Sequence, residues 1–501
     1  MLENAPQSCR VAVSSGHIGY CQEAPYWGPP CFPENPSVGL GEAAHPNPAY
    51  AGVRDCLHLL GLDAERFGKN EWNPLGEVIS PGQTVVLKPN FVRDFRETHA
   101  GLDDCVITHG SIIRAAVDYV YIALGGRGRI IIADAPQNDA DFAAIRRIAG
   151  LDEIQEFYRR QANFNIEVCD LRPERAEKVD GIITGHVPLP GDPQGYVKVD
   201  LGRHSMFAEI EHLCHLLYGA EYDTEELRSH HRGGRHEYVL SKTVLGADCV
   251  INLPKLKTHK KTGITACMKN LVGINGNKNW LPHHREGTPS QGGDQFADDG
   301  FIHRVERGAV AGFKRLFPGL GPLRRRVAGP AKAFGRRVFG DTNTDTVRSG
   351  NWHGNDTTWR MVIDLNRILM YADGAGELRD RPMRKVLNIV DGIVGGEGNG
   401  PLDPTPKAAG VVLAGFNPVA VDLVCARLMG FDWERLSVLH RALGDHPLPL
   451  AAFTREDVVC KSDDAGCDRP LTQLDGPCFA FQPHFGWAAV CSGPASAPAR
   501  T

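Results

Sequence analysis

The hydrophobic pattern of this chain alternates between short apolar runs and longer stretches with helical periodicity. The runs at residues 84–87, 130–133 and 248–253 are rich in β-branched side chains and end in turn signals, which predicts strands buried in a parallel sheet. Between the first two runs, residues 112–120 place apolar side chains at helical spacing. A strand, a helix and a strand in this order form a crossover unit, so we expect the strands to be parallel.

The same alternation continues toward the C-terminus. Residues 358–372 predict a core helix, residues 386–390 and 411–415 predict strands, and residues 417–430 predict a helix with proline in its first turn. The chain is therefore predicted to be an α/β protein. We expect an open, mostly parallel sheet with helices on both faces, an N-terminal extension and a basic insertion.

The predicted core leaves room for segments on either side of it. We expect a proline-rich N-terminal extension at residues 1–80, an α/β core at 81–432 and a C-terminal extension at 433–501. A basic insertion interrupts the core at about 300–345. Within it, residues 301–340 hold ten Lys or Arg and one acid. This segment either contacts an acidic partner or membrane surface, or is a solvated insertion that packs its apolar side chains on the core.

Composition narrows the classes of function. A net charge of −5 and a pI near 6.5 argue against general nucleic-acid binding, so any basic patch must be local. The 14 cysteines are scattered and none forms a CxxC pair. The sequence shows no signal-peptide pattern at its start and no apolar run of 18 residues. We therefore expect a cytoplasmic protein with mostly free thiols.

The segment at residues 247–275 holds five lysines directly after a predicted strand. Proline at position 254 cannot donate to a strand ladder, so we expect a loop there, at the sheet edge where ligands bind in open α/β folds. Lys255, Lys257 and His259 alternate, which would direct all three to one side of an extended loop. Such a run has two interpretations, a solvated surface or a site for a phosphate, a carboxylate or an anionic cofactor.

Lys269 and Asn270 follow this run after a small, weakly polar stretch at residues 262–268. A lysine withdrawn from water needs an anion to balance its charge, and its pKa falls. We therefore predict Lys269 and His259 to be catalytic. Asn270, Lys255 and Lys257 are predicted to contact the substrate.

Polar residues also follow the first two strands. Lys88 and Asn90 come at the end of the first strand, and Asp134 comes at the end of the second. In a parallel sheet they would share one edge with the lysine run, so we predict that they contact the substrate. His109 precedes the predicted helix and either joins its cap or faces the ligand, and we include it among the substrate contacts.

A glycine-rich segment follows the strand at residues 386–390. We expect the strand to end at Asp391 and a loop to carry Glu397, Gly398 and Asn399. Glycines allow backbone N–H groups to approach a ligand closely. Asp391 and Glu397 are predicted to be catalytic, through proton transfer or cation binding. Gly398 and Asn399 are predicted to contact the substrate.

Histidines raise the question of a metal. His259, His283 and His284 are weak candidate ligands for a metal ion, and no other cofactor is predicted. The histidines at residues 230–236 are either a metal cluster or part of a glycine-flanked polar loop. They lack regular spacing and flanking acids, which favours the loop.

Six segments, in the same order as in this chain, resemble the family catalogued as domain of unknown function 362. They are VVLKPN, THGSIIRAAVDYV, IIADAP, DCVINLPKLKTHKKTGITACMKNLVG, IVDGIVGGEGNGP and AGFNPVAVDLVCARLMG, which together span about residues 83–432. The resemblance implies an α/β domain without a settled activity. Many relatives carry an added ferredoxin-like cysteine motif, which this sequence lacks.

A fainter resemblance is to the lactate racemase catalytic domain. In that domain a histidine after a strand, a lysine about ten residues on and a later histidine serve a nickel pincer cofactor. Here His259, Lys269 and His283 or His284 stand in the same order. The glycine and proline pattern around Lys269 differs, so the resemblance implies shared architecture and not nickel.

These observations together predict an enzyme that acts on a small anionic substrate or cofactor, a carboxylate or a phosphate, in a cleft rich in lysine, histidine and glycine. The prediction assumes that the segments around residues 90, 260 and 397 converge on one cleft. Two alternatives stay open. One is a redox protein that depends on a metal or an iron–sulfur cluster, and the other is a non-catalytic binding protein that uses its basic insertion.

Overall fold

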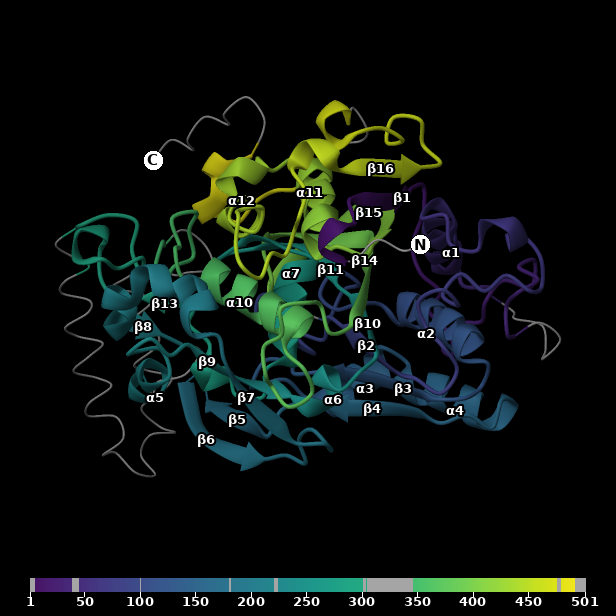
Figure 1. Cartoon of the computed structure of the whole chain (residues 1–501), viewed down its shortest axis with the longest axis horizontal. Coiled ribbons are helices and arrows are strands. Elements are labelled where there is room, and N and C mark those ends of the chain that lie inside the picture. The colour runs from purple at the N-terminus through teal and green to yellow at the C-terminus, as the bar shows by residue number, and fades with distance from the viewer. Residues whose placement is uncertain are drawn as a thin grey trace.

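The apolar runs form the parallel centre of one sheet (Figure 1). In this computed structural model, β10 (Cys249–Leu253) pairs with β2 (Thr84–Pro89), β2 pairs with β3 (Arg129–Asp134), and β3 pairs with β4 (Ile166–Asp170), all parallel. β14 (Lys385–Asn399) lies parallel to β10 on its other side. The structure describes residues 5–37, 45–99, 101–179, 182–219, 224–300, 303, 346–474 and 479–491.

The other half of the sheet is formed by strands from both ends of the chain. β15 (Asp403–Gly415) is antiparallel to β14, and β1 (Arg10–Ser14) is antiparallel to β15. β16 (Val459–Ser462) then lies parallel to β1. Parallel pairs predominate, so the predicted fold class is confirmed. The predicted N-terminal and C-terminal extensions therefore each contribute a strand to the central sheet.

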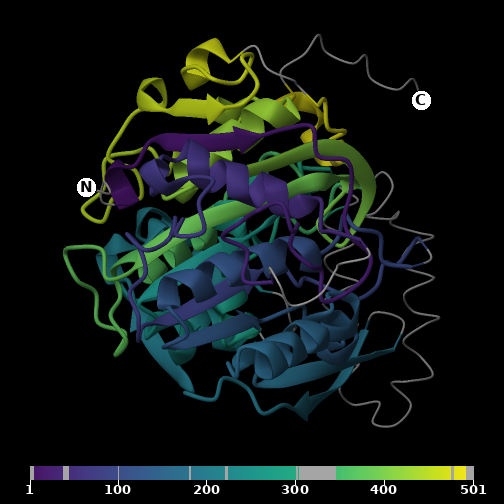
Figure 2. The same cartoon turned by 90° about the vertical axis from the view of Figure 1, so that its right-hand side faces the viewer.

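Helices cover both faces of this sheet, as predicted (Figures 1 and 2). Along β2, Val85 and Leu87 pack in one hydrophobic cluster and Val86 in another, because alternate side chains of a strand point to opposite faces. The first cluster includes the helices in front of the sheet in Figure 2, which are α1 (Ala49–Leu59), α2 (Gly110–Leu124) and α4 (Leu151–Gln161). The second includes α7 (Cys267–Asn270), α10 (Thr358–Tyr371) and α11 (Pro418–Met429).

Smaller elements surround the sheet. The short helices include α3 (Phe142–Ile148), α5 (Thr224–Ser229), α6 (Lys242–Leu245) and α12 (Ser437–His440), and the 3-10 turns include η4 (Met206–Leu216), η5 (Leu271–Ile274) and η6 (Lys278–Trp280). The two-stranded sheets pair β5 (Glu174–Val179) with β6 (Ile182–Pro188), β7 (Tyr196–Asp200) with β9 (Glu237–Ser241), and β8 (Leu217–Tyr218) with β13 (His284–Arg285).

Two segments that the sequence predicted as loops are strands. β10 ends before Pro254 as expected, but residues 255–259 form β11 (Lys255–His259), which pairs with β14 and with β12 (Gly263–Thr265). The glycine-rich segment that contains Glu397 is the second half of β14, which pairs with β15 as far as the Asn399–Asp403 pair. The physical reason is that β14 is long enough to continue past the end of β10, where its free edge offers backbone partners to β11.

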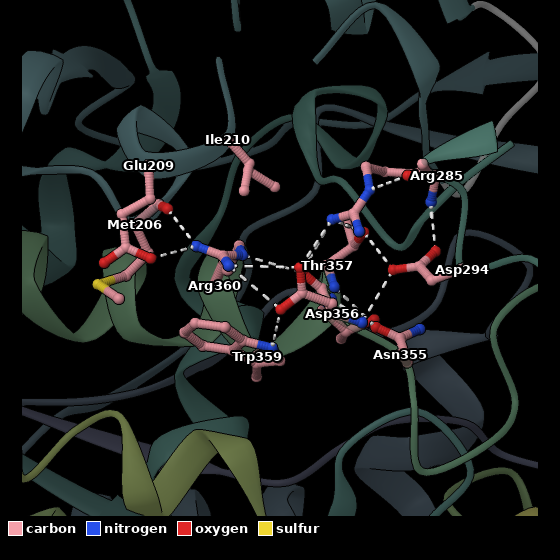
Figure 3. Close-up of polar contacts among 12 residues, drawn as sticks. Met206, Glu209, Ile210, Arg285, Asp294, Asn355, Asp356, Thr357, Trp359 and Arg360 are labelled. Carbon is pink, nitrogen blue, oxygen red and sulfur yellow. Dashed lines mark hydrogen bonds and ion pairs between the residues drawn. The ribbon is translucent and has the colours of Figure 1, made fainter. Parts of the chain in front are cut away.

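A network of charged residues holds the start of α10 (Figure 3). The buried carboxylate of Asp294 accepts hydrogen bonds from the backbone N–H of Arg285 at 2.6 Å and of Asp356 at 2.9 Å. Arg360 pairs with Glu209 of η4 at 2.9 Å and with Asp356 at 3.2 Å. Positions 294 and 356, on either side of the predicted basic insertion, are therefore joined directly.

The basic segment at residues 301–340 lies outside the described residues except for His303, so its predicted contact with an acidic partner or membrane stays a prediction. None of the helices in the described ranges has the length and apolar character to cross a membrane. Every cysteine in those ranges is a free thiol. The cytoplasmic location also stays a prediction.

Candidate functional site

A pocket of about 140 Å³ lies at the carboxyl ends of β2 and β3. This is the edge where ligands bind in open α/β sheets. Six residues predicted from the sequence line it, namely Lys88, Asn90, Asp134, His259, Lys269 and Asn270. His283, a weak metal candidate, lines it as well. The segments around residues 90 and 260 therefore converge, as the sequence predicted.

A buried ion pair forms the floor of the pocket. Lys88 Nζ lies 2.8 Å from Asp134 Oδ1, and both side chains are almost fully buried. The second oxygen of Asp134 accepts a hydrogen bond from the backbone N–H of Phe91 at 2.7 Å. Gly273 of η5 packs directly over the pair, because a Cβ there would lie 2.0 Å from Asp134 Oδ1 and 2.7 Å from Lys88 Nζ. Burial lowers the pKa of Lys88, and Asp134 opposes that effect.

A chain of side-chain amides connects the pocket to the middle of the sheet. Asn90 Nδ2 donates to Asn270 Oδ1 at 2.8 Å, and Asn270 Nδ2 donates to Asn252 Oδ1 at 2.8 Å. Asn252 Nδ2 in turn donates to Asn388 Oδ1 at 2.8 Å. Each amide both donates and accepts, so the chain fixes the orientation of Asn90 and Asn270.

Lys257 lies just behind the pocket and does not line it. Its Nζ donates to Asn90 Oδ1 at 2.8 Å and to the carbonyl of Val106 at 2.7 Å. Burial lowers its pKa to about 7, and the nearby Cys105 thiol opposes that shift. Lys257 is therefore a positioning residue for Asn90 in this arrangement.

Three further lysines line the pocket, Lys260, Lys261 and Lys278. Lys260 and Lys261 belong to the lysine run at residues 247–275, so a signal for them was present in the sequence. Lys278 follows that run, and no strand or helix pattern indicated it. Its Nζ donates to the carbonyl of Ala135 at 2.6 Å, directly after β3. The contact depends on tertiary packing alone.

Burial lowers the pKa of several lysines in the pocket. The pKa of Lys269 falls to about 8, first by burial and then by repulsion from Lys88. The pKa values of Lys261 and Lys278 fall to about 7, in both cases mainly by burial. Within the described residues, no hydrogen bond or ion pair engages the ammonium group of Lys269. An incoming anion would find this group unpaired.

The two histidines of the pocket hold their protons on opposite ring nitrogens. His259 Nδ1 accepts hydrogen bonds from the backbone N–H of Lys261 at 3.0 Å and of Thr262 at 3.2 Å, so its Nε2 carries the proton. His283 Nδ1 lies 2.8 Å from the carbonyl of Leu281, which can only accept, so its Nε2 keeps a free lone pair. Burial lowers the pKa of His283 to about 3 and that of His259 well below its ordinary value. Both rings are therefore neutral near pH 7.

Lys255 and Asp391 do not line the pocket. Lys255 Nζ lies 3.0 Å from Asp391 Oδ2 and 2.8 Å from the hydroxyl oxygen of Tyr20, with both charged side chains fully buried. Tyr20 donates to Asp391 Oδ1 at 2.5 Å. Asp391 lies within β14, and not at a strand end as predicted, because β14 continues for eight more residues to Asn399. These groups satisfy one another and form a separate cluster.

His109 belongs to this second cluster. Its ring stacks on Tyr20 with 4.1 Å between centroids, and its Nδ1 accepts a hydrogen bond from the backbone N–H of Ser111 at 3.1 Å. Of the two sequence interpretations, the structure therefore shows the helix cap. Burial lowers the pKa of His109 to about 4, although Asp391 opposes the shift. It does not line the pocket.

Glu397, Gly398 and Asn399 lie in the β14–β15 hairpin and do not line the pocket. Glu397 pairs with Lys407 at 3.4 Å and accepts a hydrogen bond from the backbone N–H of Gln482 at 2.9 Å. The carbonyl of Gly398 accepts a hydrogen bond from the Thr258 hydroxyl at 3.0 Å. Residues 401–402, just beyond this strand, do line the pocket. Glu397 therefore does not join the residues around positions 90 and 260 in one cleft, as the sequence prediction assumed. The pairing of β14 with β15 directs its side chain toward Lys407 and Gln482.

The histidines that were considered as metal ligands lie in different surroundings in the described residues. Across the ranges that the structure describes, no group of three or more His, Cys, Asp or Glu side chains is arranged to hold a metal ion. His284 lies in β13 and its ring contacts Tyr218, with centroids 4.8 Å apart. Residues 230–236 form the loop between α5 and β9, as the sequence favoured, and within it His231 and His236 are buried beside Phe207.

The fold and the pocket define an α/β protein with a mostly parallel sheet and a lysine-rich pocket at its carboxyl edge. Residues 205–427 match the family described as Domain of unknown function (DUF362). The family recognised in the sequence is thus confirmed there, from η4 to α11. For the earlier segments at residues 83–204 the resemblance stays a prediction.

Among solved structures, one match is the crystal structure of a protein from Thermotoga maritima determined by a structural genomics consortium. The match has 8% sequence identity and a TM-score of 0.29, and it covers 72% of this chain. It spans 58% of the length of the Thermotoga maritima chain. No curated protein matches the sequence. The likeness to lactate racemase stays a prediction.

Proposed function

We propose that this protein is an enzyme that acts on a small anionic molecule bound in the pocket at the carboxyl edge of β2 and β3. The observation that carries the proposal is the unpaired ammonium group of Lys269 in the lining of that pocket. A cation with no protein counter-charge is costly to bury, and an anionic ligand would offset the cost.

The neighbouring charges support the same interpretation. Among the described residues that line the pocket, Asp134 is the one carboxylate, and Lys88 pairs with it. Lys261 and Lys278 bond only to carbonyl oxygens within the described residues, and these bonds do not neutralise their charge. The pocket therefore has an excess of positive charge whenever its lysines are protonated.

Proton transfer is the chemistry that the two histidines support. His283 presents a lone pair on Nε2, and His259 presents an N–H on Nε2. A bound anion would raise the pKa of His283, whose Nε2 could then accept a proton from the bound molecule while the Nε2–H of His259 donates a hydrogen bond to it. Of the residues predicted to be catalytic, His259 and Lys269 thus keep that role, and His283 joins them. Asp391 and Glu397 lie outside the pocket and are not assigned a role in catalysis.

The test is to identify what the protein binds and converts. The intact chain would be incubated with a small-molecule extract of cells, and anions that are retained or consumed would be identified by mass spectrometry. We expect one class of anion to be retained by the wild type and lost on Lys269→Gln. We expect His283→Gln to retain it without converting it.

Lys385→Gln is the matched control, because Lys385 is an exposed lysine beside a different pocket at the opposite edge of the sheet. It should retain the anion as the wild type does. Circular dichroism would establish that each variant is folded. Equal retention by folded wild type and Lys269→Gln would refute the assignment of the pocket, and retention without conversion by the wild type would refute enzymatic activity.

A further inference from the structure

The number of unneutralised lysines indicates the charge of the ligand. Lys261 comes from the turn after β11, Lys269 from α7 and Lys278 from η6, so three elements each bring one ammonium group to a pocket of about 140 Å³. A ligand with a single negative charge would leave at least two of these charges uncompensated. A dianion would neutralise most of the excess.

The carboxylates near these lysines are already engaged. Asp134, which faces Lys88 and Lys278, is held by Lys88 at 2.8 Å. Asp294, the carboxylate that faces Lys261, accepts two backbone hydrogen bonds and one from the Thr357 hydroxyl at 2.6 Å. Lys260 adds a further positive charge beside Lys261. No carboxylate in the described lining is left to balance the three ammonium groups.

The groups of the pocket also match an oxyanion with several oxygen atoms. A phosphoryl group carries a charge of about −1.5 to −2 at neutral pH and three strong acceptor oxygens, whereas a monocarboxylate offers one charge and two oxygens. The lysine ammonium groups and the Nε2–H of His259 provide donors in the lining. Gly273 lets η5 lie close to the ion pair, and all three residues line the pocket.

We propose that the pocket binds the phosphoryl group of a phosphate compound as a dianion, with Lys261, Lys269 and Lys278 as its cationic ligands. This inference rests on the proposed function, since it specifies the class of anion. Binding should also take up protons at pH 8. Burial holds the pKa values of these lysines at about 7 to 8, and a bound dianion would raise them again.

Isothermal titration calorimetry on the full chain tests the inference, with inorganic phosphate, methyl phosphate and acetate as ligands. We expect the phosphates to bind at least tenfold more tightly than acetate. Titrations at pH 8 in two buffers with different ionisation enthalpies should show net proton uptake on phosphate binding. Comparable affinity for both phosphates indicates a phosphate ester as the natural ligand, and binding of inorganic phosphate alone indicates free phosphate.

Variants locate the binding site. Lys269→Gln and Lys278→Gln should each weaken phosphate binding by about ten- to a hundredfold, because each removes one charged hydrogen bond. Lys385→Gln should leave it unchanged. The use of two pocket variants keeps the test valid if one of them fails to fold.

The possible failures are distinguishable. If acetate bound as tightly as phosphate and Lys269→Gln weakened both, the inference that the ligand is a dianion would be wrong. The proposed anion pocket would still stand. Phosphate binding that neither pocket variant weakens would place the phosphate elsewhere and overturn the inference. Absence of measurable binding for all three ligands would count against the phosphoryl group, and the extract experiment would then decide whether another anion occupies the pocket.

Discussion

Replacement of Gly273 by alanine should disrupt the ion pair at the floor of the pocket. The new Cβ would lie 2.0 Å from Asp134 Oδ1 and 2.7 Å from Lys88 Nζ, well inside van der Waals contact. Asp134 is short and is held by Lys88 at 2.8 Å and by the Phe91 N–H at 2.7 Å, so its carboxylate cannot move away without loss of both bonds. Gly273 lies in η5 without a positive φ, so its backbone suits alanine.

The expected magnitude follows from two opposing terms. Alanine at a compatible backbone position stabilises a protein by about 0.4–1 kcal/mol, because the unfolded chain loses freedom. Disruption of a buried ion pair costs about 3–5 kcal/mol. The free energy of unfolding should therefore fall by roughly 2–4 kcal/mol, and phosphate binding should weaken with it because Lys88 and Asp134 line the pocket.

The assay is urea unfolding followed by circular dichroism, together with phosphate titration. Gly374→Ala is the control, because a Cβ at that position would meet its nearest neighbours at an ordinary 3.8 Å. We expect this control to match the wild type or to be slightly more stable. If Gly273→Ala were as stable as the wild type and bound phosphate equally well, the conclusion that η5 packs tightly against the ion pair would be refuted.

Two buried polar side chains, His231 and Asn252, should also affect the stability of the fold. Burial lowers the pKa of His231 to about 3 from its ordinary 6.5. As the pH drops below 6.5, His231 therefore takes up a proton in the unfolded state but not in the folded state. The free energy of unfolding then falls by up to about 1.4 kcal/mol per pH unit because of this residue. His231→Phe should therefore reduce the stability lost between pH 7.5 and pH 5 in urea unfolding, by about 2 kcal/mol, and an unchanged loss would contradict this. Asn252→Leu leaves Asn388 Oδ1 and Asn270 Nδ2 without their 2.8 Å partners, so it should lower the free energy of unfolding by at least about 2 kcal/mol. An Asn252→Leu variant that matched the wild type in urea would show that the amide chain contributes little.

Much of the fold followed from local patterns. The runs that form β2, β3 and β10 are apolar and β-branched because both sheet faces are covered, and this composition is visible in the sequence. The helical periodicity of α10 and α11 is equally local. The pairing partners of a strand are not local, and for this reason β11 and the second half of β14 were predicted as loops.

The candidate site was predictable where its residues follow core strands. Lys88, Asn90 and Asp134 reach the pocket because parallel strands bring their carboxyl ends to one edge. Lys255 and Asp391 carried the same kind of signal but pair with each other, because β11 and β14 lie side by side. Alternation along a strand gives the face on which a side chain lies, but not the partner that it meets there.

Local sequence patterns were enough to predict the layered α/β architecture and the edge of the sheet where polar residues gather, because strand composition and helical periodicity are properties of neighbouring residues. Which charges stay unpaired in the described residues depends instead on how distant segments pack together. The packing of η5 and η6 against the end of β3 brings Lys278 to the pocket, closes Gly273 over the ion pair and leaves Lys269 without a partner in the described residues. Charge compensation depends on distances across the fold, which no short stretch of sequence contains.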